Sequence, residues 1–248
     1  MTRVLAQVAA LALSAPCSLL AQTPTISVPF VGCPSDGQVG PVEAPTGTTV
    51  SVTTTPEAAQ LLAYYKASGD YGALAPRGWH CFRIYGSSGG SLFVTPEPID
   101  ASRAFSIHGG ELAGPAVAIE HTYGGTSGRD QVARVIARVF PKYKVFVASV
   151  REMFDLPADR FPSGPHPADK LVYRSPRVVE FRTPAHADGL GTDAWLKKGE
   201  TPIDGVAILV GDTPDLLLLS VRLPRVLVNL APTIVHQTEL DAKRSPRN

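Results

Sequence analysis

Glycine and proline interrupt this sequence along its whole length, and this limits what the chain can fold into. There are 22 glycines and 23 prolines among 248 residues, about 18% where about 12% is usual. Proline breaks helices and central strands, and glycine weakens both. Because 44% of the residues are apolar, the chain can still bury a sizeable core. The composition therefore predicts a globular protein of many short elements joined by turns, rather than a coiled coil or a disordered chain.

The charges of the chain nearly cancel, since 23 basic residues face 22 acidic ones. A chain without net charge provides no overall field that would attract nucleic acid or an anionic membrane. We therefore expect no nucleic-acid partner.

The first 21 residues have the features of a secretory signal. Arg3 is followed by an apolar stretch from Val4 to Leu13, and the small residue Ala21 precedes Gln22. The stretch is shorter than the ~20 residues that span a bilayer. We therefore expect cleavage after Ala21, no transmembrane segment in the mature chain, and a periplasmic or extracellular location.

Cleavage of this signal would remove Cys17 and leave Cys33 and Cys81. Two cysteines in an oxidising compartment are expected to pair. A zinc or redox site would need more sulfur ligands or a C-x-x-C spacing. The sequence therefore predicts a Cys33–Cys81 disulfide, and neither a metal site nor a cofactor.

The spacing of the apolar residues predicts short strands with helices between them. Strands are expected over 26–31, 48–52, 80–85, 91–95, 117–123, 170–174, 178–182, 205–210 and 216–222, and helices over 56–68, 132–139, 141–154 and 224–240. Glycine-rich turns predict two hairpins, one around 86–90 and one around 211–215. The strands of the second hairpin lack alternation, so both of their faces should be covered.

This order of elements favours an α+β fold with an antiparallel or mixed sheet, several short helices and one disulfide. Residues 22–240 are expected to form a single domain, with a disulfide-tied N-terminal part over 22–98 and a C-terminal part over 99–240. The charged residues 241–248 are expected to form a flexible tail.

Several segments resemble a group of uncharacterised exported bacterial proteins. They are VPFVGC at 28–33 with SDGQ at 35–38, LAPRGWHC at 74–81, GTSGR at 125–129 and GVAILVG at 205–211. The likeness extends over most of the mature chain. It implies a bacterial, exported protein, and it implies no activity and no catalytic residue.

A loop between a strand and a helix is the best candidate for ligand contact. Together with a histidine on the strand before it, the predicted site consists of His121, Gly124, Gly125, Thr126, Ser127, Gly128 and Arg129. Backbone amides at a helix N-terminus can receive an anion, and arginine adds a charged donor. Two other interpretations stay open: a helix cap, with Ser127 and Asp130 at capping-box spacing, or a hydroxyl of Thr126 or Ser127 activated by His121.

The segment 86–90 matches the G-x-S-x-G pattern of hydrolases, with Ser88 at the nucleophile position. That pattern requires a helix to follow, whereas a strand is expected here, so we interpret the segment as a turn.

The sequence favours a non-catalytic protein that binds a ligand or another envelope protein. The alternative is a secreted hydrolase that uses a Ser or Thr hydroxyl. The alternative requires a histidine within hydrogen-bond distance of Ser127 or Ser88 and a carboxylate behind that histidine.

Overall fold

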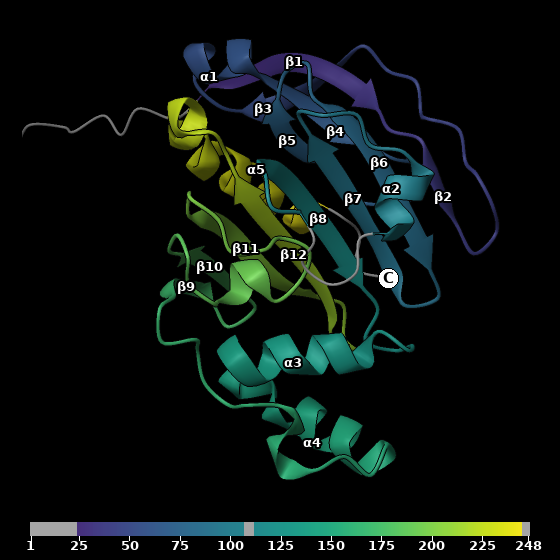
Figure 1. The fold of residues 1–248 in the computed structure, drawn as a ribbon, viewed down its shortest axis with the longest axis vertical. Coiled ribbons are helices and arrows are strands. Elements are labelled where there is room, and N and C mark those ends of the chain that lie inside the picture. Colours follow the sequence, from purple (N-terminus) through teal and green to yellow (C-terminus); the bar gives the residue numbers. More distant parts are fainter. Residues whose placement is uncertain (1–23, 107–111, 245–248) are drawn as a thin grey trace, which may run out of the picture.

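A computed structural model describes residues 24–106 and 112–244. The expected signal, residues 1–21, lies outside this range. The described chain contains two mixed β-sheets and the helices α1 to α5 (Figure 1). This confirms the predicted α+β class. No helix in the described ranges is both long and apolar enough to cross a membrane.

The smaller sheet is built from the first third of the chain. Its strands lie in the order β3 (Thr49–Thr53), β1 (Thr25–Gly32), β4 (Leu62–Lys66) and β5 (Ala73–Pro76). β1 pairs antiparallel with β3 and parallel with β4, and β5 returns antiparallel to β4. The turn between β4 and β5 carries residues that form part of the site described below.

The helix predicted over 56–68 is wrong beyond its first turns. α1 (Pro56–Leu61) begins as expected, with Pro56 in its first turn and the Thr55 hydroxyl accepting a hydrogen bond from the Ala58 amide. It ends at Leu61, because the next residues become β4 and pair with β1. Tyr65 is fully buried there. Pairing and burial of this strand outweigh the helical spacing of its apolar residues.

The larger sheet has eight strands. They lie in the order β2 (Ser35–Gly37), β6 (His80–Gly86), β7 (Gly89–Thr95), β8 (Ala116–Thr122), β12 (Asp215–Arg222), β11 (Ile203–Val210), β10 (Val178–Thr183) and β9 (Lys170–Ser175). Neighbouring strands are antiparallel except β2 and β6, which are parallel. Both predicted hairpins, β6–β7 and β11–β12, are confirmed.

Both faces of β11 and β12 are covered, as their missing alternation predicted, and so are both faces of the neighbouring β8. On one face, Val117 and Ile119 of β8 pack in a core with the smaller sheet and α5 (Ala231–Arg244). On the other face, Ala116 and Ala118 pack in a second core with α2 (Ala101–Ser106) and α3 (Arg129–Val139). Successive residues of β8 therefore point into different cores.

The helices α3 and α4 (Lys144–Met153) lie next to each other at one end of the larger sheet, joined by a 3₁₀ turn over Pro141–Tyr143 (Figure 1). Residues Val132, Val135, Ile136 and Val139 of α3 are buried, as its apolar spacing predicted. The predicted capping box is wrong, since Gly128 is the N-cap and no side chain caps the helix. Asp130 instead accepts hydrogen bonds from Arg134 and Arg160.

The C-terminal segment is helical to Arg244, which corrects the tail expected from residue 241. A 3₁₀ segment over Arg225–Leu230 leads into α5. Asp241 accepts hydrogen bonds from the Tyr64 hydroxyl at 2.9 Å and from Gln237 Nε2 at 2.7 Å. The contact with Tyr64 attaches the end of α5 to the smaller sheet. Two further 3₁₀ turns span Ala158–Arg160 and Leu190–Thr192.

Cys33 and Cys81 form the predicted disulfide, with their Cα atoms 5.4 Å apart. Cys33 directly follows β1 of the smaller sheet, and Cys81 lies in β6 of the larger one. The bond therefore joins the two sheets covalently.

Candidate functional site

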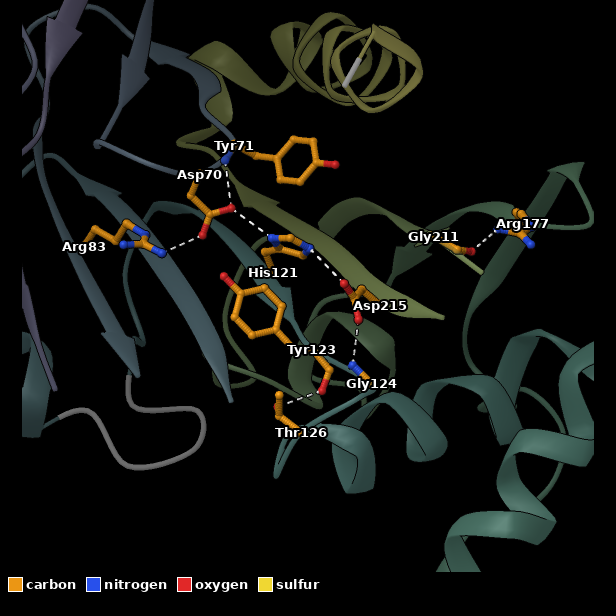
Figure 2. Close-up of polar contacts among 10 residues, drawn as sticks. All are labelled: Asp70, Tyr71, Arg83, His121, Tyr123, Gly124, Thr126, Arg177, Gly211 and Asp215. Atoms are coloured by element: carbon orange, nitrogen blue, oxygen red, sulfur yellow. Dashed lines mark hydrogen bonds and ion pairs between the residues drawn. The ribbon is translucent and has the colours of Figure 1, made fainter. Parts of the chain in front are cut away.

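A row of charged side chains crosses the larger sheet beneath the β4–β5 turn (Figure 2). Asp70, in that turn, accepts hydrogen bonds from Arg83 Nη2 at 2.7 Å and from His121 Nδ1 at 3.0 Å. His121 Nε2 lies 3.8 Å from Asp215 Oδ2. The other oxygen of Asp215 accepts a hydrogen bond from the Gly124 amide at 2.8 Å. We call Asp70, Arg83, His121 and Asp215 the His121 cluster.

Strand alternation brings three members of the His121 cluster to one face of the sheet. His121 lies two residues beyond Ile119 and points to the same face, and Asp215 precedes Leu217 on that face of β12. Arg83 on β6 reaches Asp70 by lying over Gly90, where a Cβ atom would overlap its guanidinium group. The fourth member, Asp70, comes from the other sheet. The cluster therefore forms only where the two sheets meet.

Asp70 is ionised and determines which nitrogen of His121 carries the proton. The side chain of Asp70 is only 5% exposed. Burial raises the pKa of Asp70, but the hydrogen bond from His121 and the charges of His121 and Arg83 outweigh burial and hold this pKa below its usual range. An ionised carboxylate only accepts hydrogen bonds, so Nδ1 of His121 is the donor. In the neutral ring, Nε2 then has a lone pair available.

The second ring nitrogen of His121 is buried and has no hydrogen-bond partner among the described residues. The rings of Tyr71 and Tyr123 stand nearly perpendicular to the imidazole, with centroids 5.0 Å and 4.9 Å from its own (Figure 2). These contacts, together with Asp70, hold the ring in place. The orientation of the imidazole is fixed while one of its polar atoms stays free.

A cleft of about 1080 Å³ opens over the His121 cluster. Its walls come from the β4–β5 turn, from β8, β11 and β12, and from the end of α5. The lining includes carboxylates, cations and tyrosines, and among them are Tyr64, Lys66, Asp70, Tyr71, His121, Tyr123, Arg177, Asp215, Glu239, Asp241, Lys243 and Arg244. Burial and the nearby Glu180 raise the pKa of Glu239 to about 7. The cleft thus offers hydrogen-bonding groups and charges of both signs.

Of the seven residues predicted to bind a ligand, His121 alone lines this cleft. Gly124 contacts the His121 cluster through its amide, which donates a hydrogen bond to Asp215. The rest of the loop is bonded within itself: the Thr126 hydroxyl donates to the Tyr123 carbonyl and accepts from the Gly128 amide.

Arg129 also folds back on this loop. Its Nε donates to the Thr126 carbonyl at 2.7 Å, and its Nη2 donates to the Gly125 carbonyl at 2.7 Å. Gly125, Thr126, Ser127, Gly128 and Arg129 therefore stand apart from the cleft lining, and the guanidinium group already serves the loop itself.

The structure provides one half of the geometry that a hydroxyl nucleophile requires. Asp70 stands behind His121, as in a catalytic triad. Neither Ser88 nor Ser127 forms a hydrogen bond with His121, because Nε2 has no partner in the described part of the chain. Ser88 lies in the tight turn between β6 and β7, and its carbonyl accepts a hydrogen bond from the Tyr123 amide.

Sequence reasoning missed Asp70, Tyr71, Arg83 and Asp215. Asp70 and Tyr71 lie between two glycines, a turn signal that directly follows the predicted helix over 56–68. Arg83 is a charged residue within a strand, and Asp215 begins one. A charge at a core-facing strand position is the only signal that could have singled out Arg83.

We also searched the described residues for groups of side chains that commonly bind metals. Across 24–106 and 112–244, no three His, Cys, Asp or Glu side chains lie close enough to hold an ion. Comparisons with known proteins add no assignment, since no protein-family model, curated protein or solved structure matches this chain.

Proposed function

We propose that this chain is an exported, non-catalytic binding protein whose small polar ligand occupies the cleft over His121. The N-terminal sequence and the disulfide support export to a periplasmic or extracellular space, because disulfides persist in oxidising compartments. A concave polar site favours a small ligand over a flat contact with another envelope protein.

The unpartnered Nε2 of His121 carries this proposal. A buried polar atom without a hydrogen bond costs about 1–3 kcal/mol. The surroundings hold the imidazole ring in this orientation, because Asp70 accepts from its other nitrogen and two tyrosine rings flank it. A ligand group that donates a hydrogen bond to Nε2 would recover that free energy. The loop at 124–129 contributes to the proposed site through Gly124, which positions Asp215.

Thermal-shift measurements with a panel of sugars, amino acids, amines and carboxylates test the proposal. A ligand that binds only the folded state raises the melting temperature. The key variant is His121→Asn, since the Asn amide can still donate to Asp70 while Nε2 is lost. His236→Asn is the matched control, because His236 is exposed on α5. We expect at least one compound to stabilise wild type and the control but not His121→Asn. No shift with any compound, or a shift that survives in His121→Asn, would refute the site.

A hydrolase that uses a Ser or Thr hydroxyl is the second candidate, and the Asp70–His121 pair is the observation that favours it. Such an enzyme would need a hydroxyl bonded to Nε2. A fluorophosphonate probe labels activated serines, so it separates the two candidates. We expect no labelling of the folded protein beyond that of heat-denatured protein. Labelling that His121→Asn abolishes would instead favour the hydrolase.

A further inference from the structure

Two hydrogen-bond acceptors lie side by side among the residues that line the cleft. With Nδ1 donating to Asp70, the neutral His121 ring presents a lone pair on Nε2, and the nearest charged atom is Asp215 Oδ2 at 3.8 Å. This separation exceeds a hydrogen bond. Because Nε2 is buried, a nitrogen donor that reaches both atoms at ordinary N–H···O and N–H···N distances requires the neighbouring side chains to move apart slightly.

The charges around these two acceptors favour a cation over a neutral donor. Arg83 compensates the charge of Asp70 at 2.7 Å. Asp215 is 30% exposed and, in the described part of the chain, has no cationic partner except the His121 ring. One negative charge is therefore left in the His121 cluster when His121 is neutral. A protonated amino group would balance this charge and satisfy both acceptors.

The aromatic rings beside His121 are also suited to a cation. Tyr71 and Tyr123 flank His121 and line the cleft. Aromatic rings attract cations through their π-electrons, and their carbon atoms pack against the ligand skeleton. The cations Lys243 and Arg244, in the last turn of α5, also line the cleft, as do Lys66 and Arg177.

We infer that His121 Nε2 and Asp215 Oδ2 together bind a primary ammonium group, so that the ligand of this cleft is an amine. The inference rests on the proposed binding function and adds the chemical class of the ligand. The ammonium could belong to an alkylamine, an amino sugar or the free N-terminus of a peptide. All three offer the same group to the same two atoms.

Calorimetric titration with matched pairs of compounds tests the inference and distinguishes these sources. The pairs are pentylamine and pentan-1-ol, glucosamine and glucose, and triglycine and N-acetyl-triglycine, each titrated at pH 7.5 into protein treated with EDTA. Only the first member of each pair carries an ammonium group. We expect at least one amine to bind at least tenfold more tightly than its partner, and the pair that responds identifies the source.

The variant Asp215→Asn removes the charge but keeps an oxygen that can accept from the Gly124 amide, so the fold should persist. Asp212→Asn is the matched control, because Asp212 is an exposed carboxylate in the same hairpin loop. We expect Asp215→Asn to weaken amine binding at least tenfold and Asp212→Asn to leave it unchanged. Unligated melting temperatures confirm that both variants are folded.

Several outcomes would overturn the inference. These are equal binding of an amine and its neutral partner, amine binding that Asp215→Asn retains, or no binding of any amine. If a sugar or carboxylate then binds in a manner that depends on His121, the ammonium site fails while the binding function stands. Binding of Zn²⁺ that both His121→Asn and Asp215→Asn abolish, without amine binding, would assign the two atoms to a metal instead.

Discussion

Glu120 and His121 are neighbours on β8, yet their side chains lie in opposite environments. Glu120 points to the face covered by α3, where Thr122 Oγ1 donates to one of its oxygens at 2.9 Å and Gln131 Nε2 to the other at 3.1 Å. His121 points to the face covered by the smaller sheet, where one ring nitrogen is bonded and the other has no partner among the described residues.

The two side chains differ in whether all of their polar atoms are hydrogen-bonded. Both are mostly buried and polar, so burial alone does not mark a site. Both oxygens of Glu120 are bonded inside a packed core, so nothing is left for a ligand. His121 has one buried nitrogen without a partner among the described residues, and the residue itself lines a cleft. An unpartnered polar atom in a residue that lines a cleft is the better sign of binding.

The largest expected effect on stability concerns the face of β8 that α3 covers. Val135 of α3 is 3% exposed in the core beside Glu120. Val135→Asp would bury a charge without a partner, and we expect it to lower the free energy of unfolding by about 3–5 kcal/mol. Arg134, whose side chain is 52% exposed, forms an ion pair with Asp130, so Arg134→Asp should cost less than about 1 kcal/mol.

Urea denaturation of the two α3 variants measures this contrast. Equal midpoints would show that the face of β8 that carries Glu120 is not closed by α3, and the comparison with His121 would lose its basis.

The second effect concerns the proton on Glu120. Burial raises the pKa of Glu120 from 4.5 to about 7, although its hydrogen bonds act in the opposite direction. The folded state therefore binds this proton more tightly than the unfolded state does. Its stabilisation is fully present below pH 4.5 and is lost as the pH rises to about 7, by about 3 kcal/mol in total.

Glu120→Gln removes this titration and keeps an acceptor for Thr122. We expect wild type to lose more stability than Glu120→Gln between pH 5 and pH 8, measured by urea denaturation at each pH. Glu239 titrates in the same direction in both proteins, so the difference between them isolates Glu120. If the free energies of unfolding of wild type and Glu120→Gln change in parallel with pH, Glu120 does not hold a proton in the folded state.

The smallest effects are expected in the loop that connects β8 to α3. The Thr126 hydroxyl bonds to the Tyr123 carbonyl and the Gly128 amide, so Thr126→Ala should cost about 1 kcal/mol. Ser127 does not cap α3, so Ser127→Ala should cost less than about 0.5 kcal/mol. The reverse order of melting temperatures would restore Ser127 as the cap.

Local patterns in the sequence predicted much of the fold. Alternation in β8, helical spacing in α3 and glycine-rich turns in both hairpins each depend on neighbouring residues. The disulfide followed from the cysteine count and the expected export. The parallel pairing of β1 with β4 could not be predicted, because it depends on residues distant in the sequence and reverses the local preference around Tyr64 and Tyr65.

The site was less predictable than the fold. His121 was identified as a candidate, but its partners Asp70 and Asp215 lie 51 and 94 positions away in sequence. No periodicity links such residues, and only the meeting of two sheets brings them together. The loop at 124–129 was predicted to bind a ligand because its glycines and hydroxyls can contact one. The same groups can also bond to each other within a turn.

The disulfide between the two sheets has a consequence for the order in which this site is assembled. Cys33, Cys81 and every strand of the smaller sheet precede β8 in the chain. A chain that emerges N-terminus first can therefore close the cross-link before β8 and β12 are present. Asp70 and Arg83 would then be in place early, while His121 and Asp215 arrive with the later strands. The oxidised N-terminal segment would serve as a template, because the cross-link holds the smaller sheet beside β6 before the later strands of the larger sheet are present.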